Sequence, residues 1–520
     1  MRRRALVILG VVLGLLSMAG IAFASWAAVG SGSAYSKARI LPSGNTPSTS
    51  VSGSNVTVTW SQVTFAGSNL GAVTGGGYIV KRYATGGGGA ITPNANCDST
   101  IAGATALLSC IENGVPNGSW QYTVTPALNN WRGSESTKSS TVTVASDVTA
   151  PALTTLEAFD NDHNGKIDHV VATFDENLAT PYTAPNSVWT LTNVPSLGSL
   201  ASVSVSTNQA TLTLNEGTGA ADTSVGAGAS AFKVALAANA NGIRDAAGNQ
   251  SSFAATSVAD KAPPARVSMF MQDTGGIAGK VDHVAITFSE ALASYTAGNT
   301  PWTLSGVPSG GSLSSVSVAT PVVTLNLTEG ASPADTSVGS FTIAMTASAT
   351  GVRDAAGNLA SFAATAPTDQ AKPVVVSITD TNGTTDGMIQ AGDTLVVTFS
   401  EALAPASMPT SVTVSETDPP GSGNDTLSIT GITTASDTGS DLYITGNNKT
   451  AGFASSTAAL SNGNKTITVT VAGACTGTGC ASDIAAGGPG TLVLGPVSTL
   501  TDPAGNGATG TFSVASFKIF

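Results

Sequence analysis

The chain has 520 residues, a formal net charge of −12, 59 glycines and only 10% charged residues. Helical enzymes and coiled coils need far more Glu, Lys, Arg and Leu, and a typical soluble domain has about 25% charged residues, so this composition disfavours both classes. Beyond the first few residues the sequence has no Lys/Arg cluster to neutralise phosphates, which disfavours nucleic-acid binding. The length suits roughly three to five domains.

Residues 1–24 have the pattern of a secretory signal peptide. Three arginines follow Met1, an apolar run extends to Ala24, and Ala22-Phe23-Ala24 gives a small-x-small cleavage pattern. The apolar run of about 20 residues could also span a bilayer, so an uncleaved anchor is the alternative. We expect residues 25–41 to be a linker and the rest of the chain to lie outside the membrane, in a secreted or cell-surface protein.

Four cysteines form two local pairs, Cys97 with Cys110 and Cys475 with Cys480. An even number of closely spaced cysteines in an exported chain predicts two disulfides. A metal site is the alternative, although no histidine accompanies either pair.

The segment 42–146 contains Thr- and Val-rich runs that alternate as strands do, at 56–60, 77–83, 120–126 and 141–144. These runs resemble strands B, C, F and G of a fibronectin type III domain. The sequence departs from that family at Trp120, where the family usually carries the tyrosine of strand F.

The remainder of the chain repeats with a period of about 110 residues, the size of one sandwich domain. A motif of the form T-F-x-E-x-L closes the segments 171–178, 285–292 and 396–403. A second motif, ending in A-G-N, occupies 242–249, 351–358 and 500–506, and A-D-T-S-V-G occurs at 221–226 and 334–339. The repeats predict three domains, 147–259, 260–368 and 369–520, the third with an insertion.

Short Thr/Val-rich runs bounded by Gly, Asn, Asp and Pro fill each repeat, without a sustained apolar stripe of helical period. The T-F-S-E-x-L and D-x-A-G-N motifs resemble those of bacterial immunoglobulin-like (Ig-like) modules of large surface proteins. The predicted fold class is therefore all-β, an elongated array of tandem β-sandwich domains, fibronectin type III-like and then Ig-like. The resemblance implies a bacterial spacer, adhesin or envelope component.

The segment 160–168 has the composition of a cation-binding loop. Oxygen side chains fall at its positions 1, 3, 5 and 9, a backbone carbonyl is available at position 7, and glycine at position 6 permits a sharp turn. The predicted Ca²⁺ ligands are Asp160, Asp162, Asn164, Lys166 and Asp168. The segment resembles D-x-D-x-D-G-x-x-D calcium loops. The alternative is an Asx-rich hairpin turn that satisfies its own backbone.

A second acidic pattern follows from the predicted fold. The glutamate of T-F-x-E, the aspartate of D-x-A-G-N and the aspartate of the preceding linker should share one pole of each Ig-like sandwich. The three sets are Asp147, Glu176 and Asp245; Asp260, Glu290 and Asp354; and Asp369, Glu401 and Asp502. Such carboxylates repel one another unless protonated or bridged by a cation. A junction cation is one hypothesis; the other is that aspartate caps a turn while glutamate is solvated.

The sequence favours a non-catalytic protein. The three histidines lack zinc-site spacing, and carboxylates repeated in tandem point to structure, since active sites are rarely triplicated. We expect an exported spacer or adhesin of the bacterial cell envelope with a Ca²⁺-stiffened first repeat. Its partner would be a surface glycan or protein, with no nucleic acid, and a membrane only through an uncleaved leader. The alternative is a carbohydrate-binding accessory array for secreted polysaccharide degradation, for which Trp131, Trp189 and Trp302 are the aromatic candidates.

Overall fold

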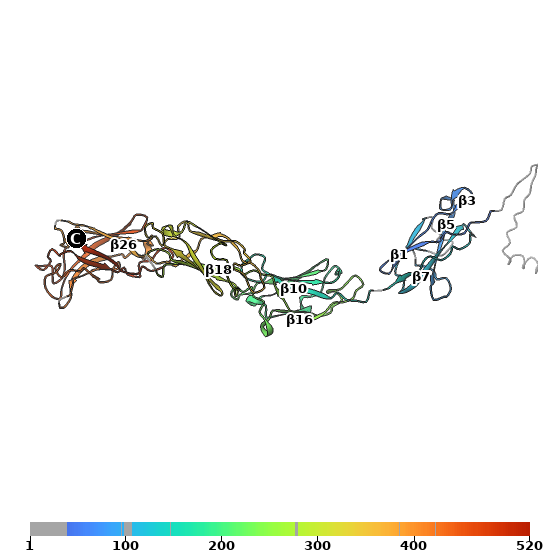
Figure 1. Cartoon of the computed structure of the whole chain (residues 1–520), viewed down its shortest axis with the longest axis horizontal. Helices are drawn as coiled ribbons and strands as arrows, with labels where there is room; N and C mark the ends of the chain where they lie inside the picture. The colour runs from blue at the N-terminus through green and yellow to red at the C-terminus, as the bar shows by residue number, and fades with distance from the viewer. Residues whose placement is uncertain are drawn as a thin grey trace, which may run out of the picture. The chain divides into compact units, whose positions relative to one another are not determined.

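The computed structural model describes residues 39–94, 96–97, 107–145, 147–275, 279–383, 385–421 and 423–520. The predicted leader 1–24 and most of the predicted linker lie outside these residues. The chain divides into two compact units, Met1–Asp147 and Val148–Phe520. The described residues form strands and short 3₁₀ turns (Figure 1), which confirms the predicted all-β class of tandem β-sandwiches. Among the described residues, no helix is long and apolar enough to cross a membrane.

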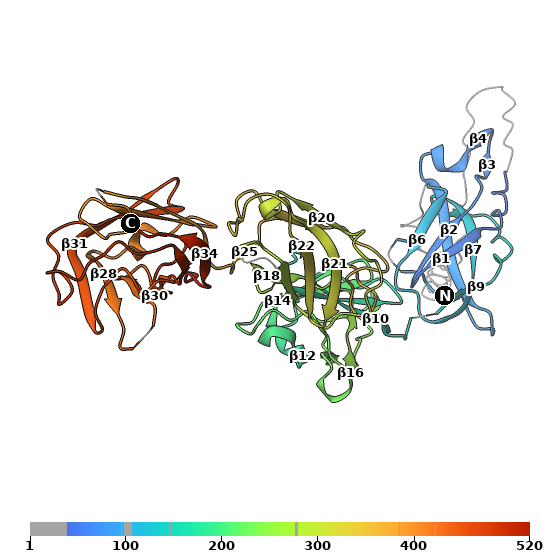
Figure 2. The same cartoon turned by 60° about the vertical axis from the view of Figure 1, so that its left-hand side comes forward.

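The N-terminal unit packs a three-stranded sheet, β1-β2-β6, with a four-stranded sheet in which β7 pairs with β5, β8 and β9 (Figure 2). Its elements are β1 (Ser48–Ser52), β2 (Asn55–Thr59), β3 (Thr64–Phe65), β4 (Ser68–Asn69), η1 (Leu70–Ala72), β5 (Gly76–Ala84), β6 (Ser109–Glu112), β7 (Gly118–Leu128), β8 (Trp131–Arg132) and β9 (Val142–Val144).

The side chain of Trp120 on β7 is bonded to a nearby backbone carbonyl. Its indole N–H donates to the carbonyl oxygen of Pro116, four residues upstream, at 2.7 Å. Tyr122, two residues further along β7, instead points into the core, where its hydroxyl donates to Glu112 at 2.7 Å and Glu112 pairs with Arg82.

The first two repeats of the C-terminal unit have the same topology. Each has a five-stranded sheet and a three-stranded sheet, in the orders β13-β14-β11-β10-β17 with β12-β15-β16, and β21-β22-β19-β18-β25 with β20-β23-β24. The elements of the first are β10 (Leu153–Phe159), β11 (His169–Phe174), η2 (Asn186–Val188), β12 (Trp189–Thr192), η3 (Pro195–Leu197), β13 (Ser199–Ser206), β14 (Gln209–Asn215), η4 (Gly228–Ser230), β15 (Lys233–Leu236), β16 (Phe253–Ser257) and β17 (Ala259–Asp260). Those of the second are β18 (Arg266–Gln272), β19 (His283–Phe288), β20 (Trp302–Ser305), η5 (Pro308–Gly310), β21 (Ser312–Ala319), β22 (Val322–Thr328), β23 (Thr342–Met345), β24 (Phe362–Thr365) and β25 (Thr368–Asp369).

The third repeat joins its strands into one path, β26-β27-β32-β31-β28-β29-β30-β33-β34. The long strand β31 makes this connection, because its first half pairs with β28 and its second half with β32. The elements are β26 (Val375–Thr381), β27 (Thr394–Phe399), η6 (Pro405–Ser407), β28 (Val412–Asp418), β29 (Thr426–Ile429), β30 (Ser436–Asp437), β31 (Lys449–Ser461), β32 (Thr466–Thr470), β33 (Gly490–Leu494) and β34 (Phe512–Phe517).

Alternation along the strands builds the cores. In β11, Val170, Ala172 and Phe174 are buried while the residues between them are half-buried, as a period of two requires. Trp189 and Trp302 are 4% and 7% exposed, and each belongs to the core of its repeat. Their indole N–H groups donate to Tyr182 and Tyr295 at 3.0 and 2.9 Å. The two tryptophans therefore recur because they fill equivalent core positions.

Both predicted disulfides are present. The Cα atoms of Cys97 and Cys110 are 5.4 Å apart, and those of Cys475 and Cys480 are 5.7 Å apart. The first bond ties a loop of the N-terminal unit to β6, and the second closes a short loop between β32 and β33.

Candidate cation sites

The loop 160–168 connects β10 to β11 and brings three carboxylates together. Asp160, Asp162 and Asp168 each offer an oxygen, and these atoms lie within 4.8 Å of one another. Asp160 is 2% exposed; its Oδ2 accepts the N–H of Gly165 at 2.9 Å, while its buried Oδ1 has no hydrogen-bond partner. Burial, assisted by the nearby Asp162 carboxylate, raises the pKa of Asp160 to about 6.

Asn164 does not turn its oxygen toward these carboxylates. Its Oδ1 accepts the N–H of Lys166 at 2.9 Å, and its amide nitrogen donates to Asp162 at 2.9 Å. The same nitrogen contacts both oxygens of Glu216, a residue directly after β14, at 2.8 and 2.9 Å. The loop thus has the backbone contacts of an Asx-rich turn as well as a carboxylate cluster. Glu216 was not a predicted site residue, because it lies 52 positions after Asn164 in the sequence.

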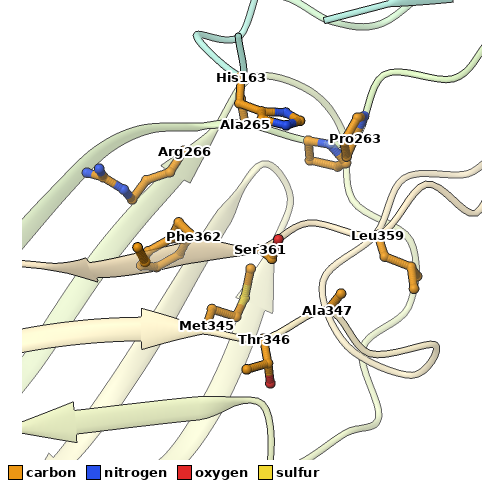
Figure 3. Close-up of a pocket in the computed structure, with 12 residues that line it drawn as sticks. His163, Pro263, Ala265, Arg266, Met345, Thr346, Ala347, Leu359, Ser361 and Phe362 are labelled. Carbon is orange, nitrogen blue, oxygen red and sulfur yellow. The ribbon is translucent and has the colours of Figure 1, made fainter. Parts of the chain in front are cut away.

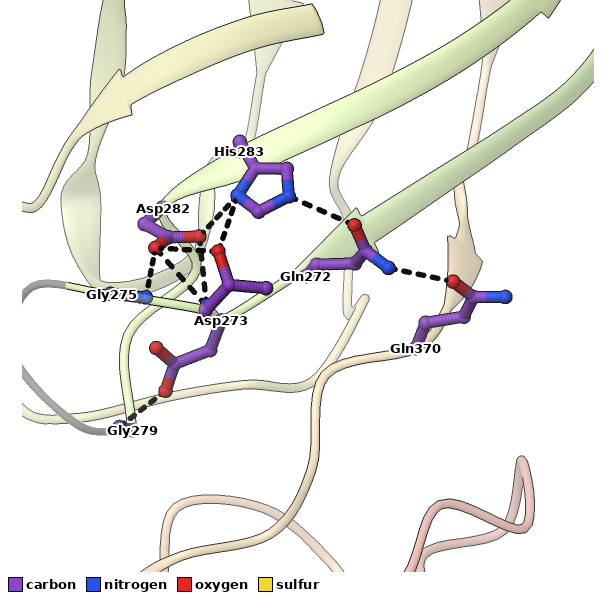
Figure 4. A network of polar contacts seen from close by, with 8 residues as sticks. Gln272, Asp273, Gly275, Gly279, Asp282, His283 and Gln370 are labelled. Carbon is purple, nitrogen blue, oxygen red and sulfur yellow. Dashed lines mark hydrogen bonds and ion pairs between the residues drawn. The ribbon is translucent and has the colours of Figure 1, made fainter.

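The corresponding loop of the second repeat directs its carboxylate to the backbone (Figure 4). Asp282 accepts the N–H of Gly275 at 2.6 Å and lies 2.6 Å from Nδ1 of His283. Nε2 of His283 is 2.8 Å from Oε1 of Gln272, whose amide donates to Gln370 at 2.9 Å. Gln370 precedes β26, so this chain of polar contacts reaches the linker to the third repeat.

The predicted junction sets also come together. The carboxylate oxygens of Asp260, Glu290 and Asp354 lie within 4.8 Å of one another, as do those of Asp369, Glu401 and Asp502. In the set of the first repeat, Glu176 and Asp245 both belong to the C-terminal unit, and their carboxylate oxygens also lie within 4.8 Å of one another. Asp147, the third member of this set, is the last residue of the N-terminal unit.

The aspartate of each D-x-A-G-N motif caps its own turn. The backbone N–H of Asn249 donates to Asp245, that of Asn358 to Asp354 and that of Asn506 to Asp502, each at 2.8 Å. The capping alternative therefore describes these aspartates correctly. The same alternative also expected the glutamate to be solvated, and this expectation is wrong in the second and third repeats, because Glu290 and Glu401 are only 8% and 2% exposed.

Contact with the preceding repeat buries these glutamates. Thr223 of the first repeat donates its hydroxyl to Glu290 at 2.6 Å and lies 2.7 Å from the hydroxyl of Ser289. In the same way, Thr336 of the second repeat donates its hydroxyl to Glu401 at 2.6 Å and lies 2.7 Å from the hydroxyl of Ser400. We call these contacts the first and second junctions. Both threonines belong to the A-D-T-S-V-G motif, whose recurrence signalled the contact although the sequence alone did not assign it a role.

The junctions keep acidic side chains in a low-dielectric setting. Burial raises the pKa of Glu290 to about 8, and the carboxylates of Asp260 and Asp354 act in the same direction. Burial likewise raises the pKa of Glu401 to about 8. Around neutral pH both glutamates therefore retain their protons unless a cation compensates them.

The second junction contains an ammonium group, that of Lys465, which the first junction lacks at the equivalent position. Nζ of Lys465 lies 3.3 Å from Oδ1 of Asp335 and donates to the carbonyl of Ser400 at 3.1 Å in the second junction. The carbonyl of Lys465 accepts the N–H of Phe399, whereas Pro321 makes the equivalent bond in the second repeat, to Phe288. At this position the first junction therefore has a proline in place of a lysine.

A pocket of about 620 Å³ lies where the loop 160–168 meets the second repeat (Figure 3). His163, Pro263 and Phe362 are among its lining residues, and the Arg266 guanidinium lies 5.2 Å from the Phe362 ring centroid. The described lining contains no carboxylate.

No protein-family model matches the chain, and no curated protein matches it. Among solved structures, the chain is similar to the FN1–FN3 domains of chicken CNTN1, with 10% identity, a TM-score of 0.17 and coverage of 62% of this chain and 98% of that one. At this TM-score the similarity carries no argument about function, and the assignment of the fold rests on the strands of the chain itself.

Proposed function

We propose that this chain is an exported structural protein of the bacterial cell envelope, a spacer or adhesin whose repeats are held by specific junctions. The two disulfides support an oxidising, extracellular location. The signal-like residues 1–24 support export, and the leader would be either cleaved or kept as an anchor. We propose no catalytic role and no nucleic-acid partner; the partner would be a surface glycan or a protein.

The observation that carries this proposal is the repeated junction contact. Thr223 and Thr336 are fully buried, and each makes the same two hydrogen bonds to the Ser-Glu pair of the following repeat. Buried hydrogen bonds that recur at successive interfaces restrict how neighbouring repeats rotate. A chain that maintains such contacts is suited to hold a binding surface at a defined distance.

Substituting both threonines tests the proposal. Thr223→Val with Thr336→Val removes two hydroxyls and leaves buried acceptors unsatisfied, at a cost of about 1–3 kcal/mol for each junction. Small-angle scattering of the full chain should show a broader distribution of distances in this variant than in the wild type. Thr154→Val is the matched control, because its exposed hydroxyl bonds only within the first repeat. Identical scattering from wild type and the double variant would count against a junction-held spacer.

We further propose that the loop 160–168 binds Ca²⁺ through Asp160, Asp162 and Asp168. The buried, unpartnered Oδ1 of Asp160 supports this, because a cation would supply the missing partner. Lys166 would contribute a backbone carbonyl, and Asn164 would join only by exchanging its present bonds. Full-chain calorimetry should show stabilisation by about 3 kcal/mol at Ca²⁺ concentrations of 100 times Kd. In Asp162→Asn the stabilisation should shrink, and an equal response from both proteins would exclude the site.

The junction carboxylates are proposed as a second, weaker class of cation site. The first junction is the better candidate, since Pro321 replaces the lysine that partly neutralises the second. The same calorimetric titration applied to Glu290→Gln tests it, with Glu401→Gln as the matched variant. If Glu290→Gln leaves the Ca²⁺ response unchanged, the junction binds no Ca²⁺, and protonation of Glu290 is what relieves the repulsion between its carboxylates.

The alternative function, a carbohydrate-binding accessory array, rests on Trp131. This side chain is 62% exposed on β8, and exposed aromatic rings stack on sugars, whereas Trp189 and Trp302 are core residues. A glycan screen with wild type and Trp131→Ala tests it. Binding that Trp131→Ala abolishes would favour this alternative over a passive spacer.

A further inference from the structure

A group of three carboxylates in the third repeat has no counterpart among the predicted sites. Asp418 ends β28, Asp425 immediately precedes β29, and Asp441 follows β30. Their carboxylate oxygens lie within 4.8 Å of one another. The pairing of Thr417 with Thr426 places Asp418 opposite Asp425 one step further along the ladder.

Two of the three carboxylates have a buried oxygen without a hydrogen-bond partner. Asp425 is 0% exposed; its Oδ2 accepts the N–H groups of Tyr443 at 2.7 Å and Ile444 at 3.0 Å, while its Oδ1 is unpartnered. Asp418 is 4% exposed, and its Oδ1 is also unpartnered. Buried polar atoms are normally satisfied, and a buried carboxylate oxygen without a partner is costly, so these two atoms call for a ligand.

Lys449, which lies opposite Asp418 in the ladder between β28 and β31, is not bonded to these two oxygens. Its ammonium group is instead 3.4 Å from Oδ2 of Asp483 and 3.5 Å from the carbonyl oxygen of Thr478. The negative charge of the cluster therefore is not balanced by the residue that the strand register brings closest.

Another buried acid borders the cluster. Glu416 lies two residues before Asp418 on the same face of β28, and both of its oxygens are buried without partners. Glu416 is 0% exposed, so three of these four acidic residues of the third repeat are buried.

We propose that Asp418, Asp425 and Asp441 bind a calcium ion. Ca²⁺ takes six to eight oxygens at about 2.3–2.6 Å, so two ligands of one ion are at most about 5 Å apart, which the cluster satisfies. Because Asp441 is exposed, water would complete the coordination from the solvent side, whereas Asp418 and Asp425 are buried. None of these residues belongs to the loop 160–168, so this proposal is independent of the one made for the loop of the first repeat.

Calcium titration of the full chain by isothermal calorimetry tests the proposal. Asp160→Asn and Asp162→Asn are present in every protein compared, which removes the proposed site of the first repeat. In this background Asp441→Asn should lose one equivalent of bound Ca²⁺ or weaken its binding at least about tenfold, because affinity follows the number of charged ligands. Asp437→Asn is the matched control, an exposed aspartate of the same segment that accepts the N–H of Gly439 at 2.7 Å. It should bind as the background does.

Asp441 is exposed, so its substitution should leave the fold intact, which circular dichroism checks. Asp425→Asn is a second variant that removes the central charge and should also lose the ion. Equal Ca²⁺ binding by the background protein and Asp441→Asn would overturn the site. Equal binding by the background protein and Asp425→Asn would do the same. Because Asp160 and Asp162 are substituted in every protein of this comparison, neither outcome bears on the loop 160–168.

Discussion

The first junction should make the stability of the second repeat fall as pH rises. Glu290→Gln should remove that dependence above about pH 6, where Asp260 of the same junction has already lost its proton. The amide oxygen of glutamine can still accept the hydroxyl hydrogen of Thr223, but the side chain has no proton to lose. In the wild type, burial raises the pKa of Glu290 from 4.5 to about 8, and Asp260 and Asp354 add to the effect. The substitution therefore separates ionisation of this residue from its packing.

The sign follows from linkage. A carboxylic acid whose pKa is higher in the folded chain contributes its full stability below pH 4.5 and loses it as pH rises through about 8. At about 1.4 kcal/mol for each pKa unit, the loss between pH 5 and pH 9 is on the order of 4 kcal/mol. For a domain of roughly 110 residues this corresponds to a fall in Tm on the order of 15 °C.

Differential scanning calorimetry of the full chain at pH 5, 7 and 9, in the presence of a chelator, measures this effect. The difference between wild type and Glu290→Gln cancels contributions from other titrating groups. Glu157→Gln is the control, because Glu157 is half-buried beside Lys261 at 3.6 Å and such pairs contribute little. Parallel pH profiles for wild type and Glu290→Gln would refute the argument that a buried acid governs this junction.

Three further outcomes are expected. Lys465→Ala should steepen the fall of stability with rising pH in the third repeat, since it removes the ammonium group from the second junction; calorimetry of the transition measures this. Replacing Cys97 and Cys110 by serine should lower the free energy of unfolding of the N-terminal unit by about 3 kcal/mol in chemical denaturation. Trp120→Phe should cost about 1 kcal/mol through loss of the bond to Pro116, whereas Trp131→Phe should leave the denaturation midpoint unchanged.

Local patterns in the sequence were sufficient for the strands and the disulfides, whereas turn capping by the D-x-A-G-N aspartates was one of two alternatives that the sequence left open. Alternation of period two places Val170, Ala172 and Phe174 on one face whatever the neighbouring strands do. Cys97 and Cys110 are separated by only 13 residues, so bringing them together costs little chain entropy. The domain boundaries and the binding of ions stay predictions.

The loop 160–168 shows which part of a site the spacing of residues does not predict. Position along 160–168 predicted correctly that Asp160, Asp162 and Asp168 lie together, since alternate residues of a tight loop point inward. It did not predict the orientation of Asn164, which depends on Glu216 after a strand more than 40 residues later. A side-chain amide orients according to its partners, and those came from another part of the fold.

The low charge and glycine-rich composition, the repeats and the all-β class were determined by the sequence itself, because each follows from residue type and local periodicity. Only the tertiary structure decided which carboxylates are buried and what they meet. Thr223 reaches Glu290 across 67 positions, and Asp418 faces Asp425 through the register of two strands in an insertion that no motif marks. Burial and strand register depend on contacts between distant segments, and these set the charge state of a carboxylate.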